Sequence, residues 1–70
     1  MPDSVYKIVE VVGGSTESWE KAAVRAVETA SHTLQDLRVA EVKALDMHIE
    51  EGKITYRTKL KLSFKYHEHD

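Results

Sequence analysis

A stretch near the end of this 70-residue chain alternates in polarity without interruption from Ile54 to Tyr66. One set of alternate positions is mostly apolar: Ile54, Tyr56, Thr58, Leu60, Leu62, Phe64 and Tyr66. The other set is polar and rich in cations: Thr55, Arg57, Lys59, Lys61, Ser63, Lys65 and His67. Because successive side chains of a strand point to opposite faces, this pattern predicts a strand with one apolar and one cationic face. About thirteen residues span about 40 Å, which is more than one helix of a small chain covers, so we expect several copies to assemble.

Another strand is expected early in the chain, from Tyr6 to Val12. Apolar residues stand at both parities there, so we expect both of its faces to be covered. The pair Gly13-Gly14 follows, and we expect it to end the strand.

A helix is expected next, from Thr16 or Trp19 to Leu34, because apolar residues recur there at spacings of three and four. Ser15 and Ser18 are alternative N-caps, and the sequence does not choose between them. Trp19 lies on the apolar stripe of this helix, which favours a role in the core or an interface over a role as a ligand platform.

The remaining strand is expected from Arg38 to Glu50, directly before the alternating one. Its apolar residues change parity near Ala44-Leu45, which predicts a β-bulge or a sharp bend. The pair Glu51-Gly52 predicts a short turn, so the last two strands form an antiparallel hairpin. The element order is β-α-β-β, and we expect a single α+β domain over residues 1–70, in which one helix lies on one face of a three-stranded antiparallel sheet.

Composition narrows the function classes. The chain has no cysteine, which excludes disulfides and thiolate metal sites. Its net charge is −2 with 31% charged residues of both signs, which argues against a nucleic-acid binder. No apolar run is long enough to cross a membrane, and a soluble cytoplasmic protein is expected. A core of this size supplies about 3–5 kcal/mol, so stabilisation by self-association is expected.

Two groups of charged side chains are candidates for ligand binding. Asp46, His48 and Glu50 share one strand face at intervals of about 7 Å, where carboxylates suit Ca²⁺ or Mg²⁺ if a neighbouring strand or subunit adds ligands. The alternative is a solvated polar face. The terminal residues His67, His69 and Asp70 are a weaker candidate for a transition metal.

A row of cations on the last strand is the second group: Arg57, Lys59, Lys61 and Lys65. It suits an anionic, nucleotide-like ligand. The alternative is a wet face whose cations pair with acids such as Glu41 on the neighbouring strand.

Catalysis finds no support in the sequence. No evident base and orienting group accompany Ser15, Ser18, Ser31 or Ser63, and no glycine-rich phosphate loop is present. We therefore expect a protein that is not an enzyme.

Four segments together resemble the dodecins. They are VYKIVEVVG at residues 5–13, SWEKA at residues 18–22, LRVAEV at residues 37–42, and YR at residues 56–57 with SFK at residues 63–65. The similarity runs from Val5 to Tyr66, and the β-α-β-β order agrees with that family. The resemblance implies a curved three-stranded antiparallel sheet that wraps the one helix. Dodecins are small flavin-binding proteins that assemble into hollow dodecamers, with ligands between the subunits, so the resemblance implies a homododecamer that stores or sequesters a flavin such as riboflavin, FMN or FAD.

The resemblance also implies a flavin pocket at the positions of Val39, Asp46, His48 and Arg57. Flavin-binding members have a stacking Trp at the position of Val39 and a Gln at that of Arg57. Val39 has no aromatic face and Arg57 only donates hydrogen bonds, which puts flavin binding in question.

The chain looks most like the calcium dodecin branch, which lacks this Trp. The alternative function is therefore a structural or calcium-binding dodecamer without a flavin role. Its Ca²⁺ ligands, chosen from their chemistry alone, are Asp46, Glu50 and Glu51.

Overall fold

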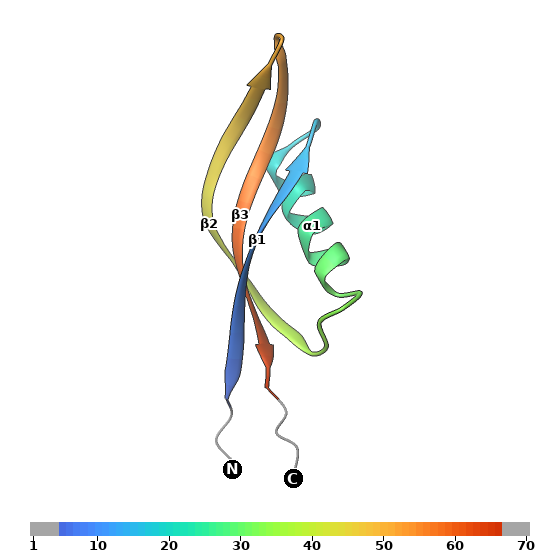
Figure 1. Ribbon diagram of the computed structural model, residues 1–70, viewed down its shortest axis with the longest axis vertical. Helices are drawn as coiled ribbons and strands as arrows, with labels where there is room; N and C mark the ends of the chain where they lie inside the picture. Colours follow the sequence, from blue (N-terminus) through green and yellow to red (C-terminus); the bar gives the residue numbers. More distant parts are fainter. Residues whose placement is uncertain (1–4, 67–70) are drawn as a thin grey trace.

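The structure of the chain, a computed structural model, describes residues 5–66. Its elements follow the order β-α-β-β: β1 (Tyr6–Ser15), α1 (Trp19–Ala30), β2 (Leu37–Glu50) and β3 (Lys53–Lys65). The strands form one antiparallel sheet in the order β1-β3-β2, and α1 lies along one side of it (Figure 1). The expected α+β fold is confirmed. The terminal group His67, His69 and Asp70 lies outside the described residues.

The core lies between α1 and the apolar face of β3. Leu60 and Leu62 are almost fully buried there and form one cluster with Ala26 of the helix. Partly buried apolar residues surround them: Val9, Val11, Ala23, Val27, Ala30, Leu34 and Leu37. Alanines on the inner face of the helix leave little side chain between the two layers, so α1 lies close to the sheet.

The helix starts at Trp19 and is capped by Ser18, whose hydroxyl accepts a hydrogen bond from the Lys21 backbone N–H at 3.0 Å. This decides between the two predicted caps. The helix ends at Ala30 rather than at the expected Leu34. The segment after Ala30 is Ser-His-Thr, residue types with modest helix propensity, and it forms turns.

Gly13 and Gly14 do not end the first strand, contrary to the expectation. β1 continues to Ser15, with Gly13 opposite Thr58 and Gly14 opposite Arg57. The reason for glycine at position 13 is the closeness of the helix, since a Cβ there would lie 2.1 Å from the Ala22 carbonyl oxygen. The sequence signal was therefore one of close approach and not of a chain break.

The parity change in β2 is confirmed as a register shift between Val42 and Ala44, and a second shift lies between Leu37 and Val39. The hairpin turn at Glu51 and Gly52 is also confirmed. Both residues have positive φ, 51° and 78°, as in the turns that match the twist of a hairpin.

Apolar side chains remain exposed on both faces of the sheet, because α1 covers only one face and is shorter than the hairpin beside it (Figure 1). On β1, Tyr6, Ile8 and Val12 are exposed on the face turned away from α1, so the expectation that both faces of this strand are covered is not met within one chain. A longer row follows β2 and the start of β3 on the face that carries the core. We call it the apolar stripe, and it consists of Val42, Leu45, Met47, Ile49 and Ile54.

Candidate functional site

The sheet face turned away from α1 carries most of the charged side chains of the strands. We call it the charged face, and its ionisable residues include Glu10, Glu41, Lys43, Asp46, His48, Glu50, Lys53, Arg57, Lys59, Lys61 and Lys65. The bulge in β2 brings Lys43 onto this face beside Ala44, so that two residues of β2 oppose Lys59 of β3.

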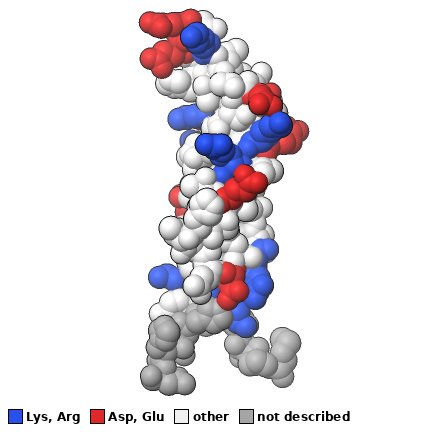
Figure 2. Space-filling view, turned by 90° about the vertical axis from the view of Figure 1, so that its right-hand side faces the viewer, with Lys and Arg blue, Asp and Glu red and all other residues white. Residues whose placement is uncertain are grey.

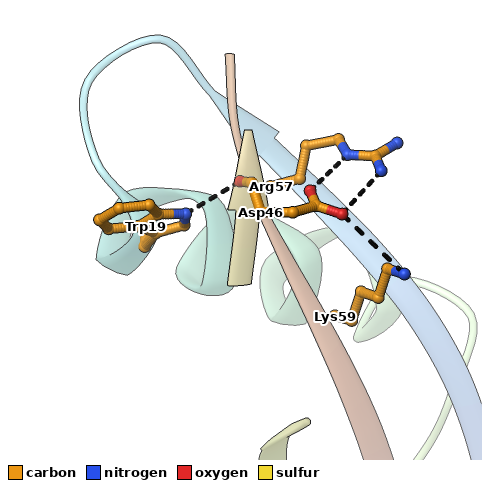
Figure 3. A network of polar contacts seen from close by, with 4 residues as sticks. All are labelled: Trp19, Asp46, Arg57 and Lys59. Atoms are coloured by element: carbon orange, nitrogen blue, oxygen red, sulfur yellow. Dashed lines mark hydrogen bonds and ion pairs between the residues drawn. The ribbon is translucent and has the colours of Figure 1, made fainter. Parts of the chain in front are cut away.

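Asp46 is the centre of an ion-pair network on this face, with contacts to Arg57 and Lys59. Asp46 and Arg57 are directly opposite in the β2–β3 pairing, and the guanidinium binds both carboxylate oxygens, Nε–Oδ1 at 2.7 Å and Nη2–Oδ2 at 2.8 Å. The Lys59 ammonium lies 3.9 Å from Oδ2 (Figure 3). Such a two-pronged arrangement fixes both side chains in one geometry.

Trp19 connects this network to the helix. Its indole N–H donates to the backbone carbonyl of Asp46 at 3.0 Å (Figure 3). Its ring also meets that of Tyr56 edge-on, with centroids 5.0 Å apart. Trp19 is partly buried. The expected packing role is therefore joined by a hydrogen bond that positions the strand carrying Asp46.

Both partners of the ion pair keep their charge across the neutral range. The hydrogen bonds from Arg57 lower the pKa of Asp46, and the nearby positive charges of Arg57, Lys59 and His48 act in the same direction. The same hydrogen bonds raise the pKa of Arg57. The sequence left two interpretations of the cation row, a site for an anionic ligand or cations paired with acids. The structure favours the second interpretation for Arg57 and Lys59, and the acid is Asp46 rather than Glu41.

The other acids of β2 gather toward the hairpin turn. The His48 Nε2 lies 3.3 Å from the Glu50 Oε1, and both side chains are exposed. Glu51 follows in the turn itself. Acidic side chains gather at the end of the molecule that holds this turn, with a basic side chain beside them (Figure 2). Lys53 is paired with Glu50 across the hairpin there.

The predicted site residues do not form one site within a chain. Val39 is exposed opposite Ser63, six positions along β3 from Arg57, which corresponds to about 20 Å. The flavin-pocket positions are thus split, with Asp46 and Arg57 at one place and Val39 at another. Within residues 5–66, no group of three or more His, Asp or Glu side chains is arranged to hold a metal ion.

A cavity of about 410 Å³ opens on the charged face next to the Asp46 network. Lys43 and Lys59 line it together with Glu10 and Val12, so it spans all three strands. Sequence reasoning missed Lys43, although the change of parity in β2 was the signal that side chains near it are re-aimed.

Three of the serines considered as nucleophiles, Ser15, Ser18 and Ser31, have structural tasks. Ser18 caps α1, the Ser15 hydroxyl accepts from the Glu17 N–H, and the Ser31 hydroxyl donates to the Glu28 carbonyl. None of these hydroxyls is held by a general base.

Among the residues that the structure describes, no helix is long and apolar enough to span a membrane.

Comparison with known proteins gives a consistent result. The family model described as Dodecin matches residues 5–67. The protein named calcium dodecin from Mycobacterium tuberculosis is 51% identical over 63 residues, which cover 89% of each chain. Its crystal structure, described as that of a calcium-chelating antigen with a calcium-binding site, superposes with a TM-score of 0.85 at 47% identity, over 96% of this chain and 97% of that one. A dodecin from Streptomyces coelicolor gives a TM-score of 0.90 at 36% identity, over 99% of this chain and 100% of that one.

Proposed function

The chain belongs to the dodecin family, and from this premise we propose that it is a non-catalytic homododecamer that binds Ca²⁺ and has no flavin role. The observation that carries the proposal is the 51% identity, over 89% of the chain, to a protein named calcium dodecin. Storage of a flavin remains a prediction that nothing in the structure favours. Location in the cytoplasm likewise remains a prediction.

The flavin alternative is weakened by the two positions that the family resemblance singled out. Val39 offers no aromatic ring on which an isoalloxazine could stack. The donors of Arg57 are directed to Asp46 at 2.7 and 2.8 Å, so a flavin would have to displace a carboxylate to reach them.

The hairpin turn is where we place the Ca²⁺ ligands, at Glu50 and Glu51. Ca²⁺ prefers carboxylate oxygens, and these two are adjacent, Glu50 as the last residue of β2 and Glu51 in the turn that follows. Glu51 also holds a left-handed backbone conformation, φ 51°, which glycine or asparagine adopts at lower cost. A carboxylate kept at a strained position suggests a task for that carboxylate.

Asp46, the third predicted Ca²⁺ ligand, is less suited to the task. Arg57 and Lys59 already neutralise its carboxylate, and a cation would have to compete with both. Glu50 and Glu51 cannot supply the six to eight oxygens that Ca²⁺ takes. The proposal therefore requires further ligands from another copy of the chain.

Assembly is supported by the exposed apolar stripe. Leu45 is 52% exposed and Ile49 is 66% exposed in the single chain. Contiguous exposed apolar residues of this kind mark interaction surfaces. A second copy is the occupant we propose, since the family resemblance implies a shell of identical chains.

Calcium binding is tested with Glu51→Asn, because Asn is better suited to the turn and removes the carboxylate. We expect Ca²⁺ at about 100 times its dissociation constant to stabilise the wild-type protein by about 2.7 kcal/mol relative to EDTA. In Glu51→Asn this gain should shrink, while stability in EDTA stays equal or rises. Glu28→Gln, at an exposed position on α1, is the control and should behave as wild type.

Calorimetric titration with CaCl₂ and thermal unfolding in EDTA are the measurements. A Ca²⁺ response equal in wild type and Glu51→Asn would reject the hairpin site, and no response in wild type would reject the proposed function. Riboflavin and FMN fluorescence should be unquenched by the protein. Submicromolar quenching would restore the flavin alternative.

A further inference from the structure

The Asp46 network has a consequence for anions that is independent of calcium. Lys43 and Lys59 line the cavity of about 410 Å³ on the charged face, and Arg57 lies next to it, where it shares the Asp46 carboxylate with Lys59. A guanidinium beside two ammonium groups that line a cavity supplies the elements of a phosphate site. The charged face differs from such a phosphate site because the Asp46 carboxylate already pairs with both Arg57 and Lys59.

We infer that Asp46 is the specificity-determining residue of the charged face, and that its carboxylate occupies Arg57 and Lys59 and thereby excludes small phosphate-bearing anions. Its two oxygens take the same pair of parallel N–H donors that a phosphate would take, at 2.7 and 2.8 Å. Oδ2 is also the oxygen that faces the Lys59 ammonium at 3.9 Å. An entering anion meets a carboxylate instead of free donors, and like charges at such distances repel.

Three features make this exclusion a built property of the fold. Asp46 lies opposite Arg57 in the β2–β3 register, so the pair forms wherever the hairpin forms. The indole N–H of Trp19 holds the Asp46 backbone from the helix side. The remaining cation at the cavity, Lys43, has its own acid in Glu41, with 3.6 Å between Nζ and Oε2.

The test is removal of the Asp46 charge with little change of shape, by Asp46→Asn. Inorganic phosphate is the probe, and isothermal titration calorimetry on the assembled protein is the measurement. Wild type should bind phosphate too weakly to detect. Asp46→Asn should bind at least about tenfold more tightly than wild type, the affinity that one charge-assisted hydrogen bond supplies. Asp46→Glu, which keeps the charge, should not gain.

Glu17→Gln is the matched control. It also removes one carboxylate from an ion pair with a lysine, Lys21, at 2.9 Å, but on the exposed surface of the helix region. It should gain no phosphate affinity. The double variant Asp46→Asn with Arg57→Gln should lose the gain, because the donors that receive the phosphate are then absent.

Several results would overturn the inference. Equal gains in Asp46→Asn and Glu17→Gln would reduce the effect to net charge, and a gain that survives in the double variant would remove Arg57 from it. No gain in Asp46→Asn, with normal size by light scattering, would show that the carboxylate excludes nothing. If Asp46→Asn does not assemble, Asp46→Ser replaces it. Phosphate binding by wild type that Arg57→Gln abolishes would also reject the inference, without any change at position 46.

Discussion

At the scale of single residues, Asp46 stabilises the fold through the negative charge it carries. Its pKa is lower in the folded chain than the ordinary aspartate value of about 3.9, chiefly because Arg57 donates hydrogen bonds to it. The unfolded chain therefore binds a proton more readily as pH falls. The stabilisation is fully present above about pH 4 and is lost as pH falls through the lowered pKa of the folded state.

This linkage predicts how Asp46→Asn differs from wild type. The variant should be less stable at pH 7, and the difference should diminish below about pH 4 as the wild-type carboxylate becomes protonated. Urea unfolding at a series of pH values measures it. A difference in stability that stays constant down to pH 2 would mean that the charge of Asp46 is not the cause.

The polarity patterns of single strands predicted which residues belong to the candidate site, but they did not predict which residues these contact. Asp46 and Arg57 were both singled out by the alternation of their strands, but their direct pairing was not predicted. It follows by counting back from the turn at Glu51 and Gly52, because the bulge at Lys43 and Ala44 lies beyond Asp46 and changes only the pairs farther along β2. The bond from Trp19 to Asp46 joins residues 27 positions apart, and no local pattern encodes such a contact.

At the scale of elements, the contact of α1 with β1 depends on the absence of a side chain at Gly13. An added Cβ would meet the Ala22 carbonyl oxygen at 2.1 Å and the Ala26 Cβ at 2.9 Å. The Ala22 carbonyl oxygen is a backbone atom of a buried helical residue, so it cannot move aside as a side chain could. The helix as a whole would have to move.

We therefore predict that Gly13→Ala destabilises the chain by about 1–3 kcal/mol or more, as overpacking of a core does. Gly14→Ala is the control, since its Cβ would meet only the Thr55 Cγ2 at 3.4 Å, an ordinary contact. Urea midpoints of the two variants measure the difference. Equal midpoints would show that the helix can shift away from the sheet without loss.

The order and type of every described element could be predicted from periodicity, because period two and period three to four are imposed by backbone geometry. β3 shows the cleanest pattern because it is the central strand, with α1 on one face and water on the other. The ends of elements were less predictable. Gly13 and Gly14 were expected to end β1, but the strand continues through both to Ser15. Position 13 requires glycine because α1 lies too close to the strand for a Cβ there, which only the three-dimensional structure shows.

At the scale of the whole molecule, the chain is elongated, with extents of 53 × 20 × 14 Å, and its helix covers only part of the sheet. The excess length of the hairpin, visible in the alternation from Ile54 onward, was sufficient to predict an assembly. The site itself was not predictable to the same degree. Its proposed Ca²⁺ ligands are incomplete in one chain, so the missing ones depend on how copies meet, which no intrachain pattern specifies.

The dependence on assembly leads to a prediction at Leu45, in the middle of the apolar stripe. Leu45 is 52% exposed in one chain, so a lysine there disturbs little of the intrachain core. Between copies, the same change loses about 1.5–3 kcal/mol of apolar burial at each contact and introduces a charge into it. Leu45→Lys should therefore reduce the mass measured by light scattering and lower the thermal stability.

Thr16→Lys adds the same charge at an exposed polar position and should leave the mass unchanged. A Leu45→Lys protein of full mass and stability would mean that the apolar stripe is not where copies meet, and a wild-type monomer that is stable at micromolar concentration would remove the need for any partner.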